Sequence, residues 1–258
     1  GADEKIIELV AAKIRSELFL GITTQEIYKN AFFLLRKYKR PVAARYSLKR
    51  AIMELGPSGF PFEDFISEIF KQQGFTTKVG TMVQGACVEH EVDVIAENAK
   101  KIIIVEAKFH NDLAIKSDLK VALYVKARVD DIRLGSVDVK VAGDERRSSK
   151  EIEAWIITNT RFTENAIKYA ACNNMKLLSW DYPARGNLYD FVNDFGVHPL
   201  TSLTTLTKQE KSRLLSAGYV LCDAIKKDKN VLRSVGIDQM RADKIFSEAN
   251  LVCNQTFS

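Results

Sequence analysis

Hydrophobic residues recur at helical spacing from residue 3 to residue 53, so this part of the chain is predicted to be helical. The first expected helix is EKIIELVAAKIRSELF, before Gly21, and the second is TTQEIYKNAFFLLRKY, with Thr24 as its cap. Pro41 ends the second helix, and VAARYSLKRAIMEL is the third. GPSGFP then marks the end of a first predicted module, residues 1–55.

The hydrophobic period changes in the middle of the chain. FEDFISEIFKQQGF predicts an amphipathic helix, and TTKVG, EVDVIAE and KIIIVEAKF alternate as strands do. A helix is expected over about 112–130, followed by the strand EAWIITNT, the helix TENAIKYAACNN and the short strand KLLSW. Strands that alternate with helices predict an α/β layer fold for a second domain, residues 56–198.

Short helical stretches return beyond Pro199. They run from TTLTKQEKSRLL to MRADKIFSEA, with no evident internal repeat. Residues 199–258 are therefore predicted to form an all-helical C-terminal module, so that two helical modules flank the α/β domain.

Composition narrows the class of protein only a little. Hydrophobic residues make up 46% of the chain and charged residues 28%, as in ordinary globular proteins. No apolar run approaches the ~18 residues that cross a bilayer, and no secretion signal is expected, so a cytoplasmic location is predicted. The net charge is +5, and residues 36–50 hold seven Lys or Arg without an acid, which fits either a solvated helix face or a polyanion-binding surface.

The cysteines and histidines show no metal-ligand spacing. They are Cys87, Cys172, Cys222, Cys253, His90, His110 and His198. Neither a structural zinc site nor a histidine-rich metallohydrolase is expected. The four cysteines are predicted to be free thiols, packed as small buried hydrophobes, in a reducing compartment.

Charged residues interrupt two apolar runs in HEVDVIAENAKKIIIVEAKFH, residues 90–110. A turn around Asn98 predicts a β-hairpin in which Asp93 lies opposite Ile104. Alternate residues of a strand share a face, so Glu106 and Lys108 share the face of Ile104, and Asp93 forms a diagonal pair with Glu106.

Two carboxylates in this arrangement suit Mg²⁺, which keeps waters and substrate phosphates as its other ligands. If the turn had the other parity, Asp93 would point to the opposite face. A solvent-facing strand with alternating charges is the other explanation, although the apolar run before Glu106 argues against it.

These residues resemble the PD-(D/E)XK nuclease superfamily, in particular the Mrr-like restriction endonucleases and the archaeal Holliday-junction resolvases. Asp93 precedes the motif Glu106-x-Lys108 by thirteen residues, and Glu63 lies on the helix before it. WIITNTRFTENAIKYA resembles a later strand and helix of Mrr-like proteins. The resemblance covers residues 57–183 and implies a restriction-endonuclease-like mixed β-sheet flanked by helices.

The resemblance implies an Mg²⁺- or Mn²⁺-dependent endonuclease that hydrolyses DNA phosphodiester bonds with an activated water. Its catalytic residues would be Glu63, Asp93, Glu106 and Lys108. Asp93, Glu106 and the carbonyl of Ala107 would hold the metal, and Lys108 would orient the water and stabilise the transition-state charge. DNA would be the partner, and a homodimer is expected because cutting both strands requires two sites.

Nucleic-acid contacts are expected after the hairpin and in the C-terminal module, at Lys116, Lys120, Arg128, Arg161, Gly236, Arg241 and Lys244. An exposed basic face is the alternative for the helix that carries Lys116 to Arg128. Tyr124 is expected to pack in the core, and His90 and His110 to be polar neighbours of the hairpin. Asn159 either lines the site or belongs to a plain loop.

The flanking modules carry weaker resemblances. GITTQEIYKNAFFLL and VAARYSLKRA resemble the later part of an ATP-cone, a nucleotide-binding regulatory module. An intact cone begins with a hairpin that holds the phosphates, and the sequence contains no counterpart, so the resemblance does not extend to binding of ATP or dATP. Residues 203–249 are similar to a helix-hairpin-helix region that binds nucleic-acid backbones, with a structural helical cap as the alternative.

Two other functions remain open from sequence alone. A non-catalytic protein on a nuclease fold would bind nucleic acid, or sense a nucleotide, without cleavage. A structure-selective junction resolvase would cleave four-way junctions in preference to linear duplex.

Overall fold

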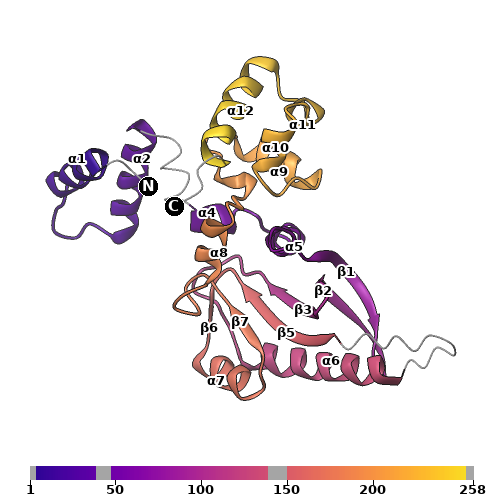
Figure 1. Ribbon diagram of the computed structural model, residues 1–258. Helices are drawn as coiled ribbons and strands as arrows, with labels where there is room; N and C mark the ends of the chain where they lie inside the picture. The colour runs from indigo at the N-terminus through magenta and orange to yellow at the C-terminus, as the bar shows by residue number, and fades with distance from the viewer. Residues whose placement is uncertain (1–3, 39–47, 139–149, 254–258) are drawn as a thin grey trace. The chain divides into compact units, whose positions relative to one another are not determined.

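The computed structural model describes residues 4–38, 48–138 and 150–253 (Figure 1). The chain divides into two compact units, Leu55–Phe195 and a unit made of Gly1–Glu54 with Gly196–Ser258. Much of the predicted third helix and of the basic segment 36–50 lies outside the described residues. Within the described ranges, no helix has the length and apolar character to span a membrane.

The unit Leu55–Phe195 is built on a mixed sheet of order β1-β2-β3-β5-β7. Its strands are β1 Thr76–Gln84, β2 Glu89–Glu97, β3 Lys101–Lys108, β5 Glu151–Thr158 and β7 Lys176–Leu178. The first three are antiparallel neighbours, whereas β3, β5 and β7 run parallel. A small second sheet pairs β4 (Lys116–Ser117) with β6 (Arg161–Phe162). The predicted α/β fold with a mixed, helix-flanked sheet is confirmed.

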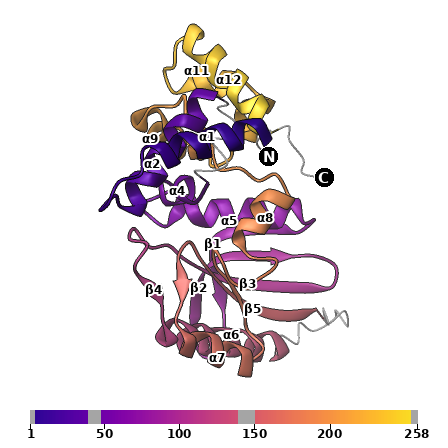
Figure 2. The ribbon, with the colours of Figure 1, turned by 90° about the vertical axis from the view of Figure 1, so that its left-hand side faces the viewer.

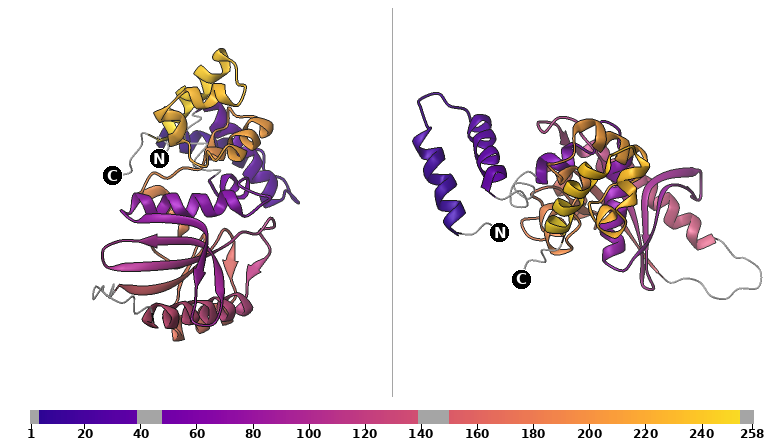
Figure 3. Two further views of the ribbon diagram at one scale, coloured as in Figure 1. Left: turned by 90° about the vertical axis from the view of Figure 1, so that its right-hand side faces the viewer. Right: turned by 90° about the horizontal axis from the view of Figure 1, so that it is seen from above.

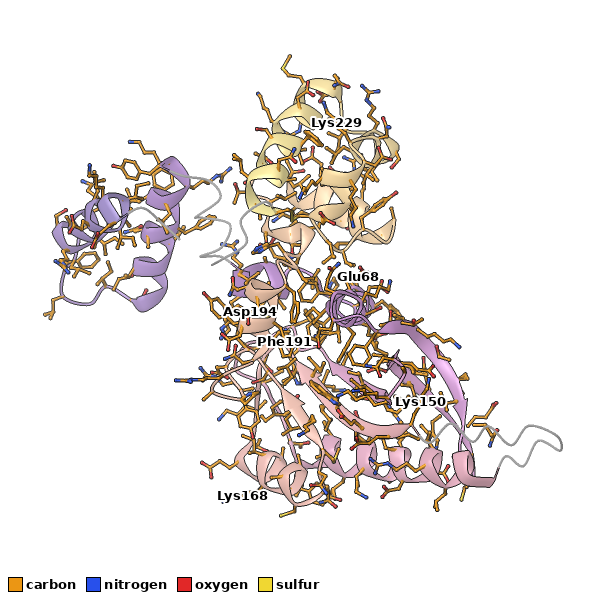
Figure 4. All side chains as sticks on the ribbon, in the orientation of Figure 1. Glu68, Lys150, Lys168, Phe191, Asp194 and Lys229 are labelled. Carbon is orange, nitrogen blue, oxygen red and sulfur yellow. A yellow bond between two sulfur atoms is a disulfide. The ribbon has the colours of Figure 1, made fainter. Side chains whose placement is uncertain are left out.

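Helices cover both faces of this sheet (Figure 2). On one face lies α5, Phe60–Gln72, and on the other lie α6, Leu119–Asp138, and α7, Glu164–Cys172. The side of α5 toward the sheet consists of buried residues at helical spacing: Phe62, Phe65, Ile66, Ile69 and Phe70. Figure 4 shows side chains filling both layers, and the labelled Lys150 donates to Glu97 at 2.5 Å beside the start of β5.

The register of β2 and β3 differs from the prediction by two residues. Ile104 pairs with Ile95, not with Asp93. The cause is the turn, because the Asn98 side chain accepts the amide of Lys101 at 3.0 Å and the Asn98 amide donates to the Lys101 carbonyl at 3.0 Å. A shift of two residues keeps every side chain on its predicted face.

The helix after the hairpin begins later than predicted. Helix α6 starts at Leu119 because Asp118 caps it, accepting the amides of Lys120 at 3.0 Å and Val121 at 3.4 Å. The residues between β3 and α6 form a loop and the short strand β4.

The turn between β1 and β2 is fastened to α6 by Asp131. This carboxylate accepts the amides of Cys87 at 2.9 Å and Val88 at 3.3 Å and lies 2.7 Å from His90 Nε2. Gly135, one helical turn further along, touches the same turn. A Cβ there would lie 2.7 Å from the amide nitrogen of Ala86.

Replacing Gly135 by alanine is expected to lower the free energy of unfolding by about 1–3 kcal/mol, because backbone must move to admit the methyl group. Alanine's higher helix propensity, worth about 1 kcal/mol, offsets only part of this loss. Urea denaturation measures the change, and Leu134→Ala, at an exposed position of the same helix, is the control. A Gly135→Ala protein as stable as the parent would show that the turn does not pack on α6.

In the other unit, α1 (Glu4–Ser16) and α2 (Thr24–Tyr38) form an antiparallel pair around Val10 and Leu35 (Figure 3). The cap of α2 is Thr23, not Thr24 as predicted, since Thr23 Oγ1 accepts the amide of Glu26 at 3.2 Å. Helix α4, Leu48–Met53, is joined to the 3₁₀ turn Leu200–Ser202 by a 2.6 Å bond from the Thr201 hydroxyl to the Ala51 carbonyl.

The C-terminal segment repeats one helix–glycine turn that the sequence analysis missed. Its helices are α9 Lys208–Ser216, α10 Asp223–Lys227, α11 Asn230–Ser234 and α12 Gln239–Cys253. Gly218 follows α9 with φ of 83°, and Gly236, 18 residues later, follows α11 with φ of 78°. The amides after each glycine, of Tyr219 and Ile237, bond back to the carbonyls of Leu214 and Leu232 at 3.0 and 3.1 Å.

The prediction of four buried free thiols is wrong. Cys222 and Cys253 form a disulfide, with Cα atoms 6.9 Å apart, and the free Cys87 and Cys172 are exposed. The pairing arises because α10 and α12 fold around one hydrophobic cluster that includes Cys222. The spacing of the cysteines along the chain does not predict this disulfide.

Candidate functional site

Asp93 and Glu106 lie beside one another on adjoining strands. The β2–β3 ladder ends at the pair Val94–Val105, and Asp93 and Glu106 are the residues that follow this pair on the two strands. The register thus brings Asp93 level with Glu106, where the prediction had a diagonal pair. Asp93 Oδ2 accepts the amide of Ala107 at 2.7 Å, which fixes this carboxylate against β3.

Two side chains of helix α6 donate hydrogen bonds to the carboxylate of Glu106. The Tyr124 hydroxyl donates to Oε1 and the Arg128 guanidinium donates to Oε2 at 2.6 Å. The same guanidinium lies 5.4 Å from the centre of the Tyr124 ring. The Glu106 side chain is 10% exposed, so it is a buried anion with one hydrogen bond to each oxygen.

Glu63, Glu91, Asp93 and Glu106 form an acidic cluster, in which the charges of Glu91 and Glu106 help to raise the pKa values of Asp93 and Glu63. Burial, with Glu106 next, raises the pKa of Asp93 to about 6, although the Ala107 amide and Arg128 oppose the shift. Burial, with Asp93 next, raises the pKa of Glu63 to about 7. Perturbed carboxylates that crowd together mark a candidate functional site.

Glu63 reaches the acidic cluster from the first turn of α5. Its amide donates to the Gly59 carbonyl at 3.1 Å, and a Cβ on Gly59 would lie 3.3 Å from Glu63 Oε1. The carboxylate therefore folds back over the helix start, where a glycine leaves room for it.

Lys108 lies two residues beyond Glu106 and so shares its face of the sheet. Its ammonium forms no ion pair with another described residue. Burial and the charge of Lys108 together lower the pKa of His110. On the neighbouring strand β5, Thr158 pairs with Lys108.

The loop beyond Lys108 is held by Asn159, which is buried. Its amide group accepts from the His110 amide and donates to the His110 carbonyl, each at 2.8 Å. His110 Nε2 also lies 3.0 Å from the Ser117 hydroxyl of β4. Asn159 thus supports the loop next to the acidic cluster. The other predicted neighbour, His90, contacts Asp131.

The donor set fits a hard divalent cation. Asp93 and Glu106 offer carboxylate oxygens on one face, and the Arg128 guanidinium shows that a positive charge already lies against Glu106. Among the described residues there is no group of three or more His, Cys, Asp or Glu placed to hold a metal ion. Protein ligands at this site would therefore be few, as Mg²⁺ tolerates.

The predicted nucleic-acid contacts fall into two groups. Lys116, Lys120 and Lys244 are exposed, and Gly236 has the left-handed backbone of a tight turn. The remaining arginines are held by carboxylates: Arg128 by Glu106, Arg161 by Asp181 at 3.0 Å, and Arg241 by Glu210 at 2.7 Å.

Sequence reasoning missed the roles of two residues. Tyr124, expected to be packed, is 38% exposed and donates to Glu106. Arg128, expected to contact phosphate, is the cation on Glu106. Their spacing of four residues, shared with Lys120, places all three on one face of a helix and was the available signal.

Comparison with known proteins identifies the domain that carries these residues. Residues 56–182 match the Mrr-type restriction endonuclease family, and residues 198–253 match the AF1548-like C-terminal family. An uncharacterized protein of Archaeoglobus fulgidus is 34% identical over 188 residues, 72% of this chain and 99% of that protein.

A crystal structure described as that of AF1548, a protein of unknown function, is also similar. Its TM-score is 0.59 and its sequence is 31% identical, covering 76% of this chain and 98% of that one. Residues 1–55 lie outside both matched families, so the ATP-cone resemblance stays a prediction. The helix-hairpin-helix resemblance does too, because the matched C-terminal family is a different one. The chain belongs to the AF1548-like proteins, and its residues 56–182 form a restriction endonuclease domain.

Proposed function

We propose that the protein is a metal-dependent endonuclease that hydrolyses phosphodiester bonds of DNA. The observation that carries the proposal is the two carboxylates of Asp93 and Glu106 at the end of the β2–β3 ladder, with Lys108 on the face of Glu106, inside a restriction endonuclease domain. Hydrogen bonds orient the carboxylates of Asp93 and Glu106, and the Lys108 ammonium forms no ion pair with another described residue. Together they supply oxygen ligands for a cation and an ammonium beside it.

Each residue has a distinct role in this proposal. Asp93, Glu106 and the Ala107 carbonyl would hold Mg²⁺ or Mn²⁺, which when bound would lower the pKa of a water ligand and offset phosphate charge. Lys108 would orient the attacking water and stabilise the charge that develops on the phosphate. Glu63, with its raised pKa, would complete the acidic cluster and is suited to exchange a proton with that water.

Exposed lysines would position the DNA. Lys116 lies on β4, just before α6, and Lys120 lies in the first turn of α6, close in sequence to the residues that hold Glu106. In the C-terminal segment, Lys244 and the turn at Gly236 remain proposed backbone contacts. Arg241 bonds Glu210 and the Thr205 carbonyl, so it joins α12 to α9 and is not carried forward as a DNA contact.

The test is cleavage of supercoiled plasmid DNA by the purified protein. Nicked or linear product is expected with Mg²⁺ or Mn²⁺ and none with excess chelator, because the acidic cluster needs a cation to bind a phosphodiester. Linear product formed without dissociation would support the proposed homodimer. A protein that binds DNA but leaves it intact with every divalent cation would instead be a binding protein on a nuclease fold.

A further inference from the structure

Arg128 and Glu106 form an ion pair at the centre of the proposed site, and no step assigned so far uses it. Among the described residues, Arg128 is the cation within ion-pairing distance of the acidic cluster, at 2.6 Å from Glu106 Oε2. It also counters the charge of Asp93. The guanidinium therefore neutralises the same two carboxylates that are proposed to hold the metal.

A guanidinium and a divalent cation on one carboxylate would repel each other. Both would lie against Glu106, in a site where burial weakens the screening by water. The Tyr124 hydroxyl, which also donates to Glu106, is neutral and would not be repelled by a divalent cation on that carboxylate. Of the two α6 side chains on Glu106, only the guanidinium has an electrostatic reason to leave.

After leaving Glu106, the guanidinium could bind a substrate phosphate on the same face of α6. Arg128 lies two helical turns beyond Lys120 on the same face of α6, and its side chain is 22% exposed rather than fully enclosed. A phosphodiester drawn to that face would accept two hydrogen bonds from a guanidinium fork, which a lysine cannot provide.

We propose that Arg128 is an internal countercation that occupies Glu106 before the divalent metal binds and is displaced onto the substrate phosphate afterwards. This inference rests on the proposed function, because it assumes that Asp93 and Glu106 hold the metal. Arg128 would bind Glu106 first and the substrate phosphate second. Tyr124 would keep Glu106 in place during this exchange. The competing explanation is a permanent brace, in which Arg128 orients Glu106 as a ligand.

The exchange and the brace predict opposite changes in metal affinity. If Arg128 must be displaced, Arg128→Gln binds Mn²⁺ more tightly than the wild type, by about tenfold, because no cation competes for Glu106. If Arg128 is a brace, the same variant binds Mn²⁺ more weakly. Lys120→Gln is the matched control, since it removes one charge from the same helix face without a contact to Glu106, and its affinity should stay within about twofold of the wild type.

Calorimetric titration of Mn²⁺ into the wild type, both glutamine variants, Asp93→Asn and the double variant with Arg128→Gln and Asp93→Asn decides between them. Tighter binding by Arg128→Gln, lost when Asp93 is also replaced, supports the exchange. Equal or weaker binding by a folded Arg128→Gln overturns it while leaving the metal site intact. Absence of Mn²⁺ binding in the wild type and in Arg128→Gln alike overturns the metal site itself, and the inference with it.

A measurement on the wild type covers the case in which Arg128→Gln does not fold. The Nε–H signal of Arg128 in a ¹H–¹⁵N spectrum, assigned with Arg128→Lys, is expected to shift when Mg²⁺ saturates the site. An unchanged signal at saturation means that the guanidinium stays on Glu106, which contradicts the exchange. In the presence of Ca²⁺, Arg128→Gln should also bind a DNA duplex about tenfold more weakly, in line with the loss of a charged phosphate contact.

Discussion

Replacing Lys108 by alanine is expected to reduce DNA cleavage by about a thousandfold, which is the loss typical of removing one group that stabilises transition-state charge. The fold should be unaffected, because the ammonium forms no ion pair with another described residue. Plasmid nicking measured over time, with thermal denaturation in parallel, checks both parts of the expectation. Binding of Mn²⁺ should persist, since Lys108 is not one of the proposed ligands.

Lys100→Ala is the matched control for this experiment. Lys100 lies in the turn at the other end of the same hairpin and is exposed. It should cleave DNA at the wild-type rate. Full activity in Lys108→Ala, or an equal loss in both variants, would remove Lys108 from the mechanism.

Replacing Asp93 by asparagine is expected to abolish cleavage and Mn²⁺ binding while making the protein more stable at pH 8. Asparagine keeps an oxygen that can accept the Ala107 amide, which Asp93 accepts at 2.7 Å, but it removes a charge from a half-buried acidic cluster. The gain in the free energy of unfolding is about 1–2 kcal/mol, after solvent screening of the partly exposed carboxylate is allowed for. Loss of activity with a gain in stability is typical of a functional residue held in a strained environment.

The pH dependence follows from the direction of the pKa shifts. The folded protein raises the pKa of Asp93 from 3.8 to about 6 and that of Glu63 from 4.5 to about 7. Between the unfolded and folded values the folded state binds more protons than the unfolded state, so these two groups lower stability as the pH rises through this window.

Melting temperatures of the wild type and Asp93→Asn should therefore diverge as the pH rises from 4 to 8. Saturating Mn²⁺ should narrow the difference at pH 8 by stabilising the wild type alone. If Asp93→Asn were less stable than the wild type at pH 8, the carboxylate would be a structural group, and the acidic cluster would need another explanation.

The sequence was sufficient for the face of the sheet on which the charges lie, because strand alternation fixes faces. It was insufficient for the register, which depends on how the Asn98 side chain closes the turn. The predicted faces were still correct because the register differed by an even number of residues, two. An odd shift would have separated Asp93 from Glu106.

The contact of α6 with Glu106 could not be predicted from strand alternation, and the four-residue spacing of Tyr124 and Arg128 was its available signal. It depends on where α6 begins and how it is rotated above the sheet, and the capping role of Asp118 was not recognised. The repeat in the C-terminal segment is visible as LLSAG and LRSVG, so the prediction of no internal repeat missed this signal. The pairing of Cys222 with Cys253 is a property of helix packing and had no signal along the chain.

Anomalous diffraction from a crystal soaked in Mn²⁺ is the decisive observation for a cation site on the β2–β3 hairpin. A peak is expected between the carboxylates of Asp93 and Glu106, with the Lys108 ammonium beside it and the guanidinium of Arg128 moved away from Glu106. At saturating Mn²⁺, an empty position there and an intact Arg128–Glu106 pair would contradict metal-dependent hydrolysis by this protein.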